Sequence, residues 1–431
     1  MRRYLRSLAP GLTGDAWRLQ AGGLVNAVGT GLVYPFLLIY LTNVRGIPLG
    51  LAGLTVGLTA VVTAFATPAV GAAIDRAGAR AVLALALGLQ AVGWGLFPLI
   101  RAPWHAFVLA AVAGAGTAAF WPSQSTLLIG VVAPDRRDAA FAVQRITQNF
   151  GMALGAVAGG LIATTADAST YTVLFLLDAA TFVVYGLVLT AVRPPRREPD
   201  LAGAGPPRYR EVFRNRVFLA VVGINVVLVT AAYAQFDATL PVFAKNEVGV
   251  SEKGIGALFF VNMIVVALAQ LPITRALAGR SRVRAIAAAA WLASASFLLV
   301  VATALWLEGG EALALLLAMT IGFTLAETLH GATQSALVAD LAPERLRGRY
   351  LSLLTNSYAL GFSIGPALGA LVLAESAVAV WIGACVVLAL AAVALHGLEP
   401  RVPKHARLAG VAGEQRGDVT PRSSRRSASR R

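Results

Sequence analysis

The chain alternates between long apolar stretches and short polar connections. No charged residue occurs from Leu49 to Val70 or from Ala81 to Ile100. A helix of about 20 apolar residues crosses the roughly 30 Å of hydrocarbon in a bilayer, and these stretches lack the alternation of barrel strands. The pattern predicts an all-α membrane protein with twelve transmembrane helices, near residues 16–41, 50–73, 80–100, 104–131, 139–163, 170–191, 214–240, 252–276, 284–306, 311–337, 349–374 and 377–397.

The composition supports this class. Hydrophobic residues make up 57% of the chain and charged residues 13%, whereas a soluble domain carries about 25% charged residues. The chain lacks the phosphate-binding loop of an ATP-driven pump and the motifs of a membrane hydrolase. Its single cysteine, Cys385, excludes an intrachain disulfide, and its four histidines are scattered along the chain. We therefore expect no enzyme activity, no metal site and no cofactor.

Basic residues gather on one side of the predicted membrane. The opposite loops hold little beyond Arg45, Arg101, Lys245 and Lys253. Cytoplasmic loops carry the excess of lysine and arginine, so we expect both termini in the cytoplasm and the protein in the inner membrane. The net charge of +15 follows from this topology, and no nucleic-acid partner is expected. The residues that set it include Arg2, Arg3, Arg6, Arg76, Arg80, Arg136, Arg137, Arg280, Arg282, Arg284, Arg345, Arg347 and Arg349.

Two segments do not fit a membrane. Residues 192–213 are rich in proline, glycine and arginine and indicate a cytoplasmic linker between an N-terminal bundle, 1–191, and a C-terminal bundle, 214–400. Residues 401–431 have few apolar side chains, so we expect a disordered basic tail. Its arginines either contact anionic lipid or only fix the topology. We expect the chain to work as a monomer.

The two halves repeat each other. "VVAPDRRDAAFAVQRITQNFGMALGAVAGG" begins at Val131, and "ADLAPERLRGRYLSLLTNSYALGFSIGPALGA" begins at Ala339. Both sequences contain a polar loop, a basic turn and then glycines at every fourth position. Parallel repeats of six spans are a transporter plan, with the substrate site between the halves.

A short charged motif between the second and third spans identifies a family resemblance. Gly71-x-x-x-Asp75-Arg76-x-Gly78-x-Arg80 resembles the loop signature of the major facilitator superfamily. The stretches "AETLHGATQSALVADLAPERLRGRY" and "YAQFDATLPVF" look like the multidrug-resistance relatives in its drug:proton antiporter branch. The resemblance covers nearly the whole chain. It implies twelve helices in two pseudo-symmetric bundles and transport of a small molecule.

Glycines in the fifth and eleventh spans extend this resemblance. The fifth span matches the glycine-rich antiporter motif, but Ala156 stands where the family usually has proline. The eleventh span restores the proline. We expect these residues to pack helices closely: Gly151, Gly155, Gly159, Gly160, Gly361, Gly365, Pro366 and Gly369.

One family residue is absent. The family's fourth-span motif has an arginine four residues before a glycine, and that arginine is implicated in proton coupling. Here the glycine is Gly114, and Ala110 occupies the arginine's place. The alanine at this position does not contradict a transporter, but it is evidence against proton antiport. The alternatives are an uncoupled facilitator or importer and a non-transporting receptor or scaffold.

The motif from Gly71 to Arg80 predicts a cytoplasmic latch. Gly71 lets a neighbouring helix approach, and Gly78 permits a positive φ. Asp75 could face the N-terminus of span eleven, where a carboxylate is favoured. Arg80 could bridge to Asp135 or Asp138. Such contacts would join the cytoplasmic ends of the halves, although the charges could also be a positive-inside anchor alone.

Charged residues inside spans are costly and indicate function. Glu327 lies roughly 24 Å into span ten, which lines the cavity in the resembled family, and His330 shares its helix face. This pair could bind and release a proton, or Glu327 could be structural. Asp237 lies near the outer end of span seven, where it could attract cations or be merely interfacial. Asp178 lies in span six, which is peripheral in the family, and could either couple protons or have a structural role.

Further polar residues predict a cavity. Arg145 and Asn149 lie in the cytoplasmic part of span five and could form an inner gate, although Arg145 could also extend to the interface. Other candidates for the cavity wall are Asn26, Tyr34, Gln124, Gln334, Asn356 and Tyr358. Such a cavity would suit a small lipophilic compound, with or without a positive charge. We therefore expect export of such a compound, exchanged for protons, by alternating access.

Overall fold

The computed structural model describes residues 12–133, 136–193, 209–343 and 346–408. Eleven helical segments in these ranges are long and apolar enough to cross a membrane. A further helix of 26 residues, α7, carries the polar residues near Arg145 and corresponds to the fifth predicted span. The observed helices confirm the predicted all-α membrane fold. Most of the predicted boundaries agree within two residues.

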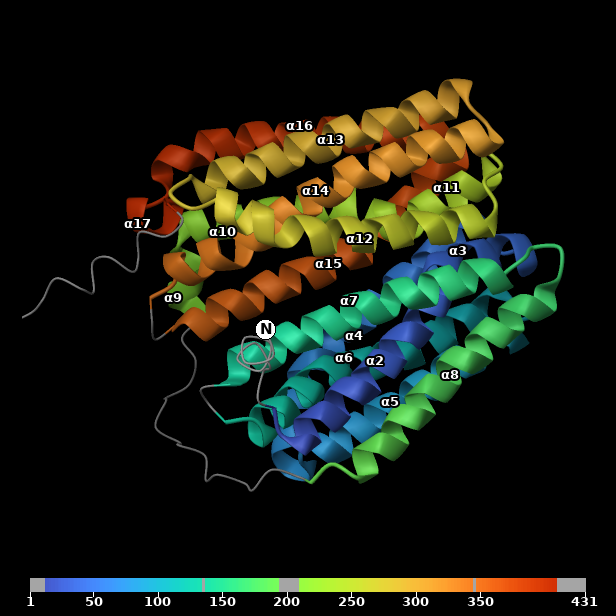
Figure 1. Cartoon of the computed structure of the whole chain (residues 1–431), viewed down its shortest axis with the longest axis horizontal. Coiled ribbons are helices and arrows are strands. Elements are labelled where there is room, and N and C mark those ends of the chain that lie inside the picture. The colour runs from blue at the N-terminus through green and yellow to red at the C-terminus, as the bar shows by residue number, and fades with distance from the viewer. Residues whose placement is uncertain (1–11, 134–135, 194–208, 344–345, 409–431) are drawn as a thin grey trace, which may run out of the picture.

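The described helices form two halves, which Figure 1 shows in blue to green and in yellow to red. Each half contains six long helical segments. The first half contains Gly14–Val44 (α2, η1, α3 and η2), α4 (Leu49–Ala77), α5 (Ala79–Gly95), α6 (Pro103–Val131), α7 (Arg137–Ile162) and α8 (Ala168–Thr190). The second half contains Arg216–Asn246 (α10, η5, η6 and α11), α12 (Glu252–Ala276), α13 (Arg282–Trp306), α14 (Gly309–Leu341), α15 (Arg347–Glu375) and α16 (Ala377–Leu398). Short helices α9 (Tyr209–Arg214) and α17 (Lys404–Arg407) precede and follow it.

We call the end of the molecule that holds α9 and α17 the linker side and the opposite end the far side (Figure 1). Each half is packed through its glycines. A Cβ on Gly155 of α7 would meet the backbone of Val28 and Gly31 in α2. A Cβ on Gly365 of α15 would likewise meet Ala234 and Thr230 of the seventh span. Small residues let helix backbones approach closely where no hydrophobic force drives association.

The two halves touch on the far side. Gly53 of α4 lies against Ala370 of α15, and Gly160 of α7 lies against Gly256 of α12. On the linker side, by contrast, no atom of another described helix lies within 4 Å of a Cβ placed on Gly71. The close helix approach predicted at Gly71 is therefore absent in this conformation, because the linker-side ends of the halves are apart.

The turn after α4 has the backbone conformation predicted for Gly78. Gly78 adopts φ 85°, the conformation expected for the turn between α4 and α5. Among the described residues, Arg80 Nη2 donates to the carbonyl of Thr190 at 2.8 Å, within the same half. Asp135 and the side chain of Asp138 lie outside the described residues. The latch stays a prediction about the conformation that is closed on the linker side.

The first residues after α16 are folded. The prediction of a disordered tail is wrong for residues 401–408, which form α17 and a bridge between Leu408 and Ser281. Arg282 Nη1 donates to the carbonyl of Ala406 at 2.9 Å, and Ala406 is fully buried. An arginine at the start of α13 therefore holds the segment against the second half. Residues 409–431, like most of the predicted linker, lie outside the described ranges.

Candidate functional site

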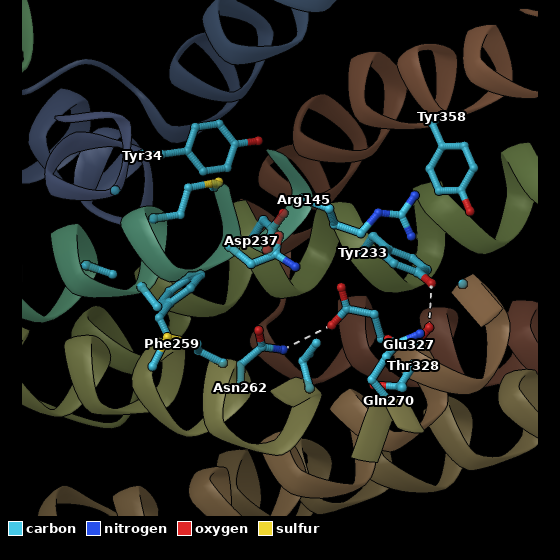
Figure 2. Close-up of a pocket in the computed structure, with 18 of the residues that line it drawn as sticks. Tyr34, Arg145, Tyr233, Asp237, Phe259, Asn262, Gln270, Glu327, Thr328 and Tyr358 are labelled. Atoms are coloured by element: carbon cyan, nitrogen blue, oxygen red, sulfur yellow. Dashed lines mark hydrogen bonds between the residues drawn. The ribbon is translucent and has the colours of Figure 1, made fainter. Parts of the chain in front are cut away.

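A cavity of about 510 Å³ lies between the two halves, within the usual range for small-molecule sites. The first half contributes residues of α2, η1 and α7, and the second contributes residues of the seventh span, α12, α14 and α15. Polar side chains from both halves point into it (Figure 2). The ones that the following argument uses are Tyr34, Arg145, Asn149, Tyr233, Asp237, Asn262, Glu327 and Tyr358.

Two π-helical turns in the seventh span place Tyr233 and Asp237 in this cavity. The turns are η5 (Val229–Tyr233) and η6 (Gln235–Thr239). The buried Gln235 donates through Nε2 to the carbonyl of Thr230 within these turns and to the carbonyl of Gly365 in α15. Such π turns are frequent at functional sites. Asp237 therefore lines the central cavity, which corrects its expected position near the outer membrane interface.

Glu327 of α14 is held by an amide. Asn262 of α12 donates from Nδ2 to Glu327 Oε2 at 3.0 Å and to Thr324 Oγ1 at 2.9 Å (Figure 2). The structure shows no ion pair to Glu327 among the residues it describes. The carboxyl group therefore faces the cavity with a neutral hydrogen-bond donor as its support.

His330 is separated from the cavity by a tyrosine. Its Nδ1 shares a hydrogen bond with the hydroxyl of Tyr233 at 2.7 Å, and its Nε2 is buried without a partner in the described part of the chain. Tyr233 lines the cavity, whereas His330 lies behind it. Tyr233 OH also lies 3.4 Å from the backbone carbonyl oxygen of Glu327, and the described residues show no hydrogen bond between His330 and the Glu327 carboxyl group.

Arg145 of α7 brings a positive charge from the opposite half. Figure 2 shows its side chain in the same space as Asp237 and Glu327. Neither Arg145 nor Asp237 makes a hydrogen bond or an ion pair with any described residue. The cavity thus presents one guanidinium from the first half and two carboxyl groups from the second.

The arrangement of two helical halves around a cavity agrees with the protein family that the sequence matches. The model of the Major Facilitator Superfamily matches residues 20–329 and 226–428. The chain belongs to the major facilitator superfamily.

Relatives of this major facilitator are transporters. It is 27% identical to the uncharacterized MFS-type transporter YqjV of Bacillus subtilis (strain 168), over 82% of this chain and 85% of the relative. It is 26% identical to a Na(+), Li(+), K(+)/H(+) antiporter of Planococcus maritimus, over 78% and 84% of the two chains. The multidrug resistance protein MdtH of Salmonella typhimurium is 24% identical, over 80% and 83%.

Solved transporters share the fold. The nucleoside transporter NupG aligns with a TM-score of 0.71 at 13% identity, covering 90% of this chain and 99% of its own. The peptide transporter POT in complex with alafosfalin aligns with a TM-score of 0.74 at 15% identity, covering 93% and 98%. The family match and the curated relatives make this major facilitator a multi-pass membrane transporter and not an enzyme.

Half of the predicted wall residues line the cavity of this major facilitator. Tyr34, Arg145, Asn149 and Tyr358 do so. Asn26, Gln124 and Gln334 are buried away from the cavity. Asn356 is exposed and does not line the cavity either. Gln124, for example, donates to the hydroxyl of Tyr185 at 3.0 Å inside the first half. A polar residue in a span can face a neighbouring helix of its own bundle, which the sequence does not distinguish from the cavity.

Asp178 is one of these inward-facing groups. It is 2% exposed, and its Oδ1 has no partner in the described residues. It lies beside Gly29 of α2, so it belongs to the packing between α8 and α2 rather than to the cavity.

This position makes Asp178 a control for proton coupling. We expect the neutral isostere Asp178→Asn to transport substrate and protons at the wild-type ratio, because the side chain touches neither the cavity nor Glu327. The measurement is proton flux per substrate in proteoliposomes. A changed ratio would assign coupling to the interface between α2 and α8 instead.

The sequence analysis missed six polar wall residues: Tyr233, Asn262, Gln270, Thr328, Ser335 and Thr355. A usable signal was present for Asn262, the single amide in the apolar run "GALFFVNMIVVALA". An amide in hydrocarbon needs a partner, and here the partner is Glu327. No comparable indication existed in the sequence for Tyr233, because the π turns determine that its side chain faces the cavity.

The cavity extends toward the linker side. Its wall runs along α12 from Phe259 to Gln270, about 16 Å at 1.5 Å per residue. The far side is closed by contacts between the halves. Asn43 and Asn246 exchange reciprocal amide hydrogen bonds of 2.7 and 3.2 Å, and Glu252 Oε1 accepts from the backbone N–H of Thr165 at 2.9 Å.

These far-side contacts predict a conformational bias. Replacing Asn43 and Asn246 by Ala removes two exposed hydrogen bonds, each contributing about 0.5 kcal/mol at the lower end of the usual range. We expect the population open on the far side to rise about fivefold. Spin labels at Trp104→Cys and Trp306→Cys, in a background lacking Cys385, report the distance between the far-side ends of α6 and α13.

The matched control is Asn225→Ala. Asn225 donates to Ser357 Oγ at 2.7 Å within the second half, so its loss leaves the label distances unchanged. An unchanged distance distribution in the double variant would contradict the assignment of Asn43 and Asn246 as closing contacts.

Proposed function

We propose that this major facilitator is a proton-coupled antiporter of the inner membrane that exports a small lipophilic compound. The observation that carries the proposal is the position of Glu327. Its carboxyl group lines a cavity between the halves and is supported by the amide of Asn262 rather than by a cation. Either a proton or a cationic group of the substrate can then neutralise it.

The free-energy cost of a charge inside the membrane makes the Glu327 carboxyl group suitable for exchanging a proton for a substrate. An uncompensated charge inside a membrane costs several kcal/mol, so Glu327 favours one neutralising partner at every stage of the cycle. When the cavity faces outward, a proton displaces the substrate. When it faces inward, the substrate displaces the proton. The names of the relatives, a cation/proton antiporter and a multidrug resistance protein, support exchange as the mode of transport.

The arginine distribution supports an orientation. With the linker side in the cytoplasm, the cavity opens toward the cytoplasm and the far-side contacts close the outer entrance. Substrate then enters from the cell. We infer that Asp75, Arg76 and Arg80 act in the opposite conformation, when the linker-side ends of the halves meet.

A second candidate function is an uncoupled facilitator. The observation in its favour is Ala110, a small buried residue of α6 at the position of the family's coupling arginine. In the proposed antiporter, Arg145 of the next helix supplies the guanidinium of the first half to the cavity.

One experiment separates the two functions. Purified protein is placed in liposomes that contain a pH-sensitive dye, a pH gradient is imposed, and lipophilic cations are added as a panel. Substrate-dependent proton flux supports the antiporter. Substrate movement without proton flux supports the facilitator, and the absence of both contradicts a transport function for the panel tested.

A further inference from the structure

A second, smaller cavity lies inside the second half, behind the wall of the main cavity. Its volume is about 20 Å³, and it lies between the seventh span, α13, α14 and α16. Tyr233 and Glu327 line both cavities (Figure 2). These two residues are partly exposed, whereas every other residue of the small cavity is buried. Tyr233 and Glu327 therefore form the partition between the two cavities.

The wall of the small cavity is mostly hydrocarbon but contains one buried polar atom without a partner. His330 is 2% exposed, and its Nδ1 shares the hydrogen bond of 2.7 Å with the Tyr233 hydroxyl. Its Nε2 has no partner in the described part of the chain. An unsatisfied buried polar atom is unfavourable, so Nε2 indicates a cavity that receives a group able to bond to it. Five of the wall residues are alanines: Ala232, Ala289, Ala290, Ala293 and Ala326.

A water molecule fits this cavity but suits it poorly. The volume exceeds the roughly 10–15 Å³ that a water needs, yet a buried water typically has about two to four polar partners. His330 Nε2 is the single unpartnered polar atom among the described residues of the wall. A slim carbon chain that ends in a hydroxyl group matches the wall better, because the chain contacts the alanines and the hydroxyl reaches Nε2. A hydroxyl both donates and accepts, so it suits either tautomer of His330.

The partition leaves a route from the main cavity to Nε2. Glu327 has a long side chain that is partly exposed to the main cavity, so it can move aside without disturbing the helix packing. Tyr233 keeps its bond to Nδ1 while a chain passes between the two side chains. The room beyond the partition exists because alanines stand at five wall positions, where larger side chains would fill it.

We propose that the small cavity is a subsite of the main cavity and binds a slim, hydroxyl-bearing end of the substrate, with the hydroxyl bonded to His330 Nε2. The inference rests on the proposed function in taking the main cavity as the substrate site. It deepens that function by naming a chemical feature of the substrates, and it makes His330 a specificity-determining residue.

The test uses three lipophilic cations with one body. They are methyltriphenylphosphonium, pentyltriphenylphosphonium and (4-hydroxybutyl)triphenylphosphonium, of which the last two carry arms of equal length. Binding to the purified full-length protein in detergent is measured by calorimetry at neutral pH. We expect the hydroxybutyl probe to bind about tenfold more tightly than the pentyl probe, as for one hydrogen bond gained.

Two variants assign the contact and the space. His330→Asn retains an amide atom near the Tyr233 hydroxyl but lacks Nε2, so the affinity ratio of the hydroxybutyl and pentyl probes should fall to about one. Ala293→Val adds methyl groups to the wall, so both long arms should lose affinity about tenfold while the methyl probe binds as before. Ala288→Val, at an exposed alanine of α13, is the matched control and should keep the wild-type affinities. Unfolding temperatures show that each variant is folded.

Three outcomes overturn the inference. They are equal binding of the hydroxybutyl and pentyl probes to the wild type, an unchanged ratio in His330→Asn, and no binding of the hydroxybutyl probe. The first of these would leave the small cavity to water. Because binding is measured without a pH gradient, it is independent of proton movement. A hydroxyl preference without proton flux would leave this inference standing and reject the antiporter, whereas proton flux without the preference would do the opposite.

Discussion

Replacing Glu327 by Gln is expected to abolish proton-driven accumulation of substrate. Glutamine retains the shape of the side chain and can still accept the hydrogen bond from Asn262, so the fold should persist. It cannot bind and release a proton. One pH unit supplies about 1.4 kcal/mol per proton, which maintains about a tenfold concentration ratio for a coupled substrate. In the variant this ratio should fall to about one.

The measurement is the steady-state ratio of labelled substrate across the liposome membrane under an imposed pH gradient. Asp178→Asn is the matched control, since it neutralises another carboxyl group inside a span but outside the cavity. Glu327→Gln should still exchange substrate for substrate when no pH gradient is present. Accumulation equal to that of the wild type would remove Glu327 from the coupling mechanism.

Gly155→Val is expected to cause the largest loss of stability. A Cβ at this position would meet the carbonyl oxygen of Val28 and the Cα of Gly31. Both atoms belong to the backbone of α2, so no side-chain rotation can make room and the helices must separate. Overpacking of a protein interior costs about 1–3 kcal/mol, and a displaced helix pair should reach the upper end of this range.

The matched control for this prediction is Gly186→Val in α8. No atom lies within 4 Å of a Cβ placed on Gly186. Thermal unfolding of the two detergent-solubilised variants should therefore differ, with only Gly155→Val showing a lowered midpoint or a loss of monodisperse protein. Equal midpoints would mean that α2 and α7 can move apart at little cost.

The sequence by itself determined the spans and the packing glycines. A membrane span must satisfy its backbone hydrogen bonds within one helix, so length and apolarity locate it without knowledge of its neighbours. The glycines at every fourth position share one helix face for the same local reason. Thus the predicted fifth span, 139–163, agrees closely with α7 (Arg137–Ile162), and Gly155 lies close to the backbone of a neighbouring helix, α2.

Only the tertiary structure decided which polar residues meet. Asp237 and Tyr233 reach the cavity through π turns that depend on Gln235 and on a carbonyl of α15. Asp178 and Glu327 are both single carboxyl groups in apolar runs, yet one faces Gly29 and the other faces the cavity. In a soluble helix, the polar face marks the side toward water. In a membrane, the sides toward lipid and toward protein are both apolar, so the direction of each side chain is set by contacts with helices distant in the sequence.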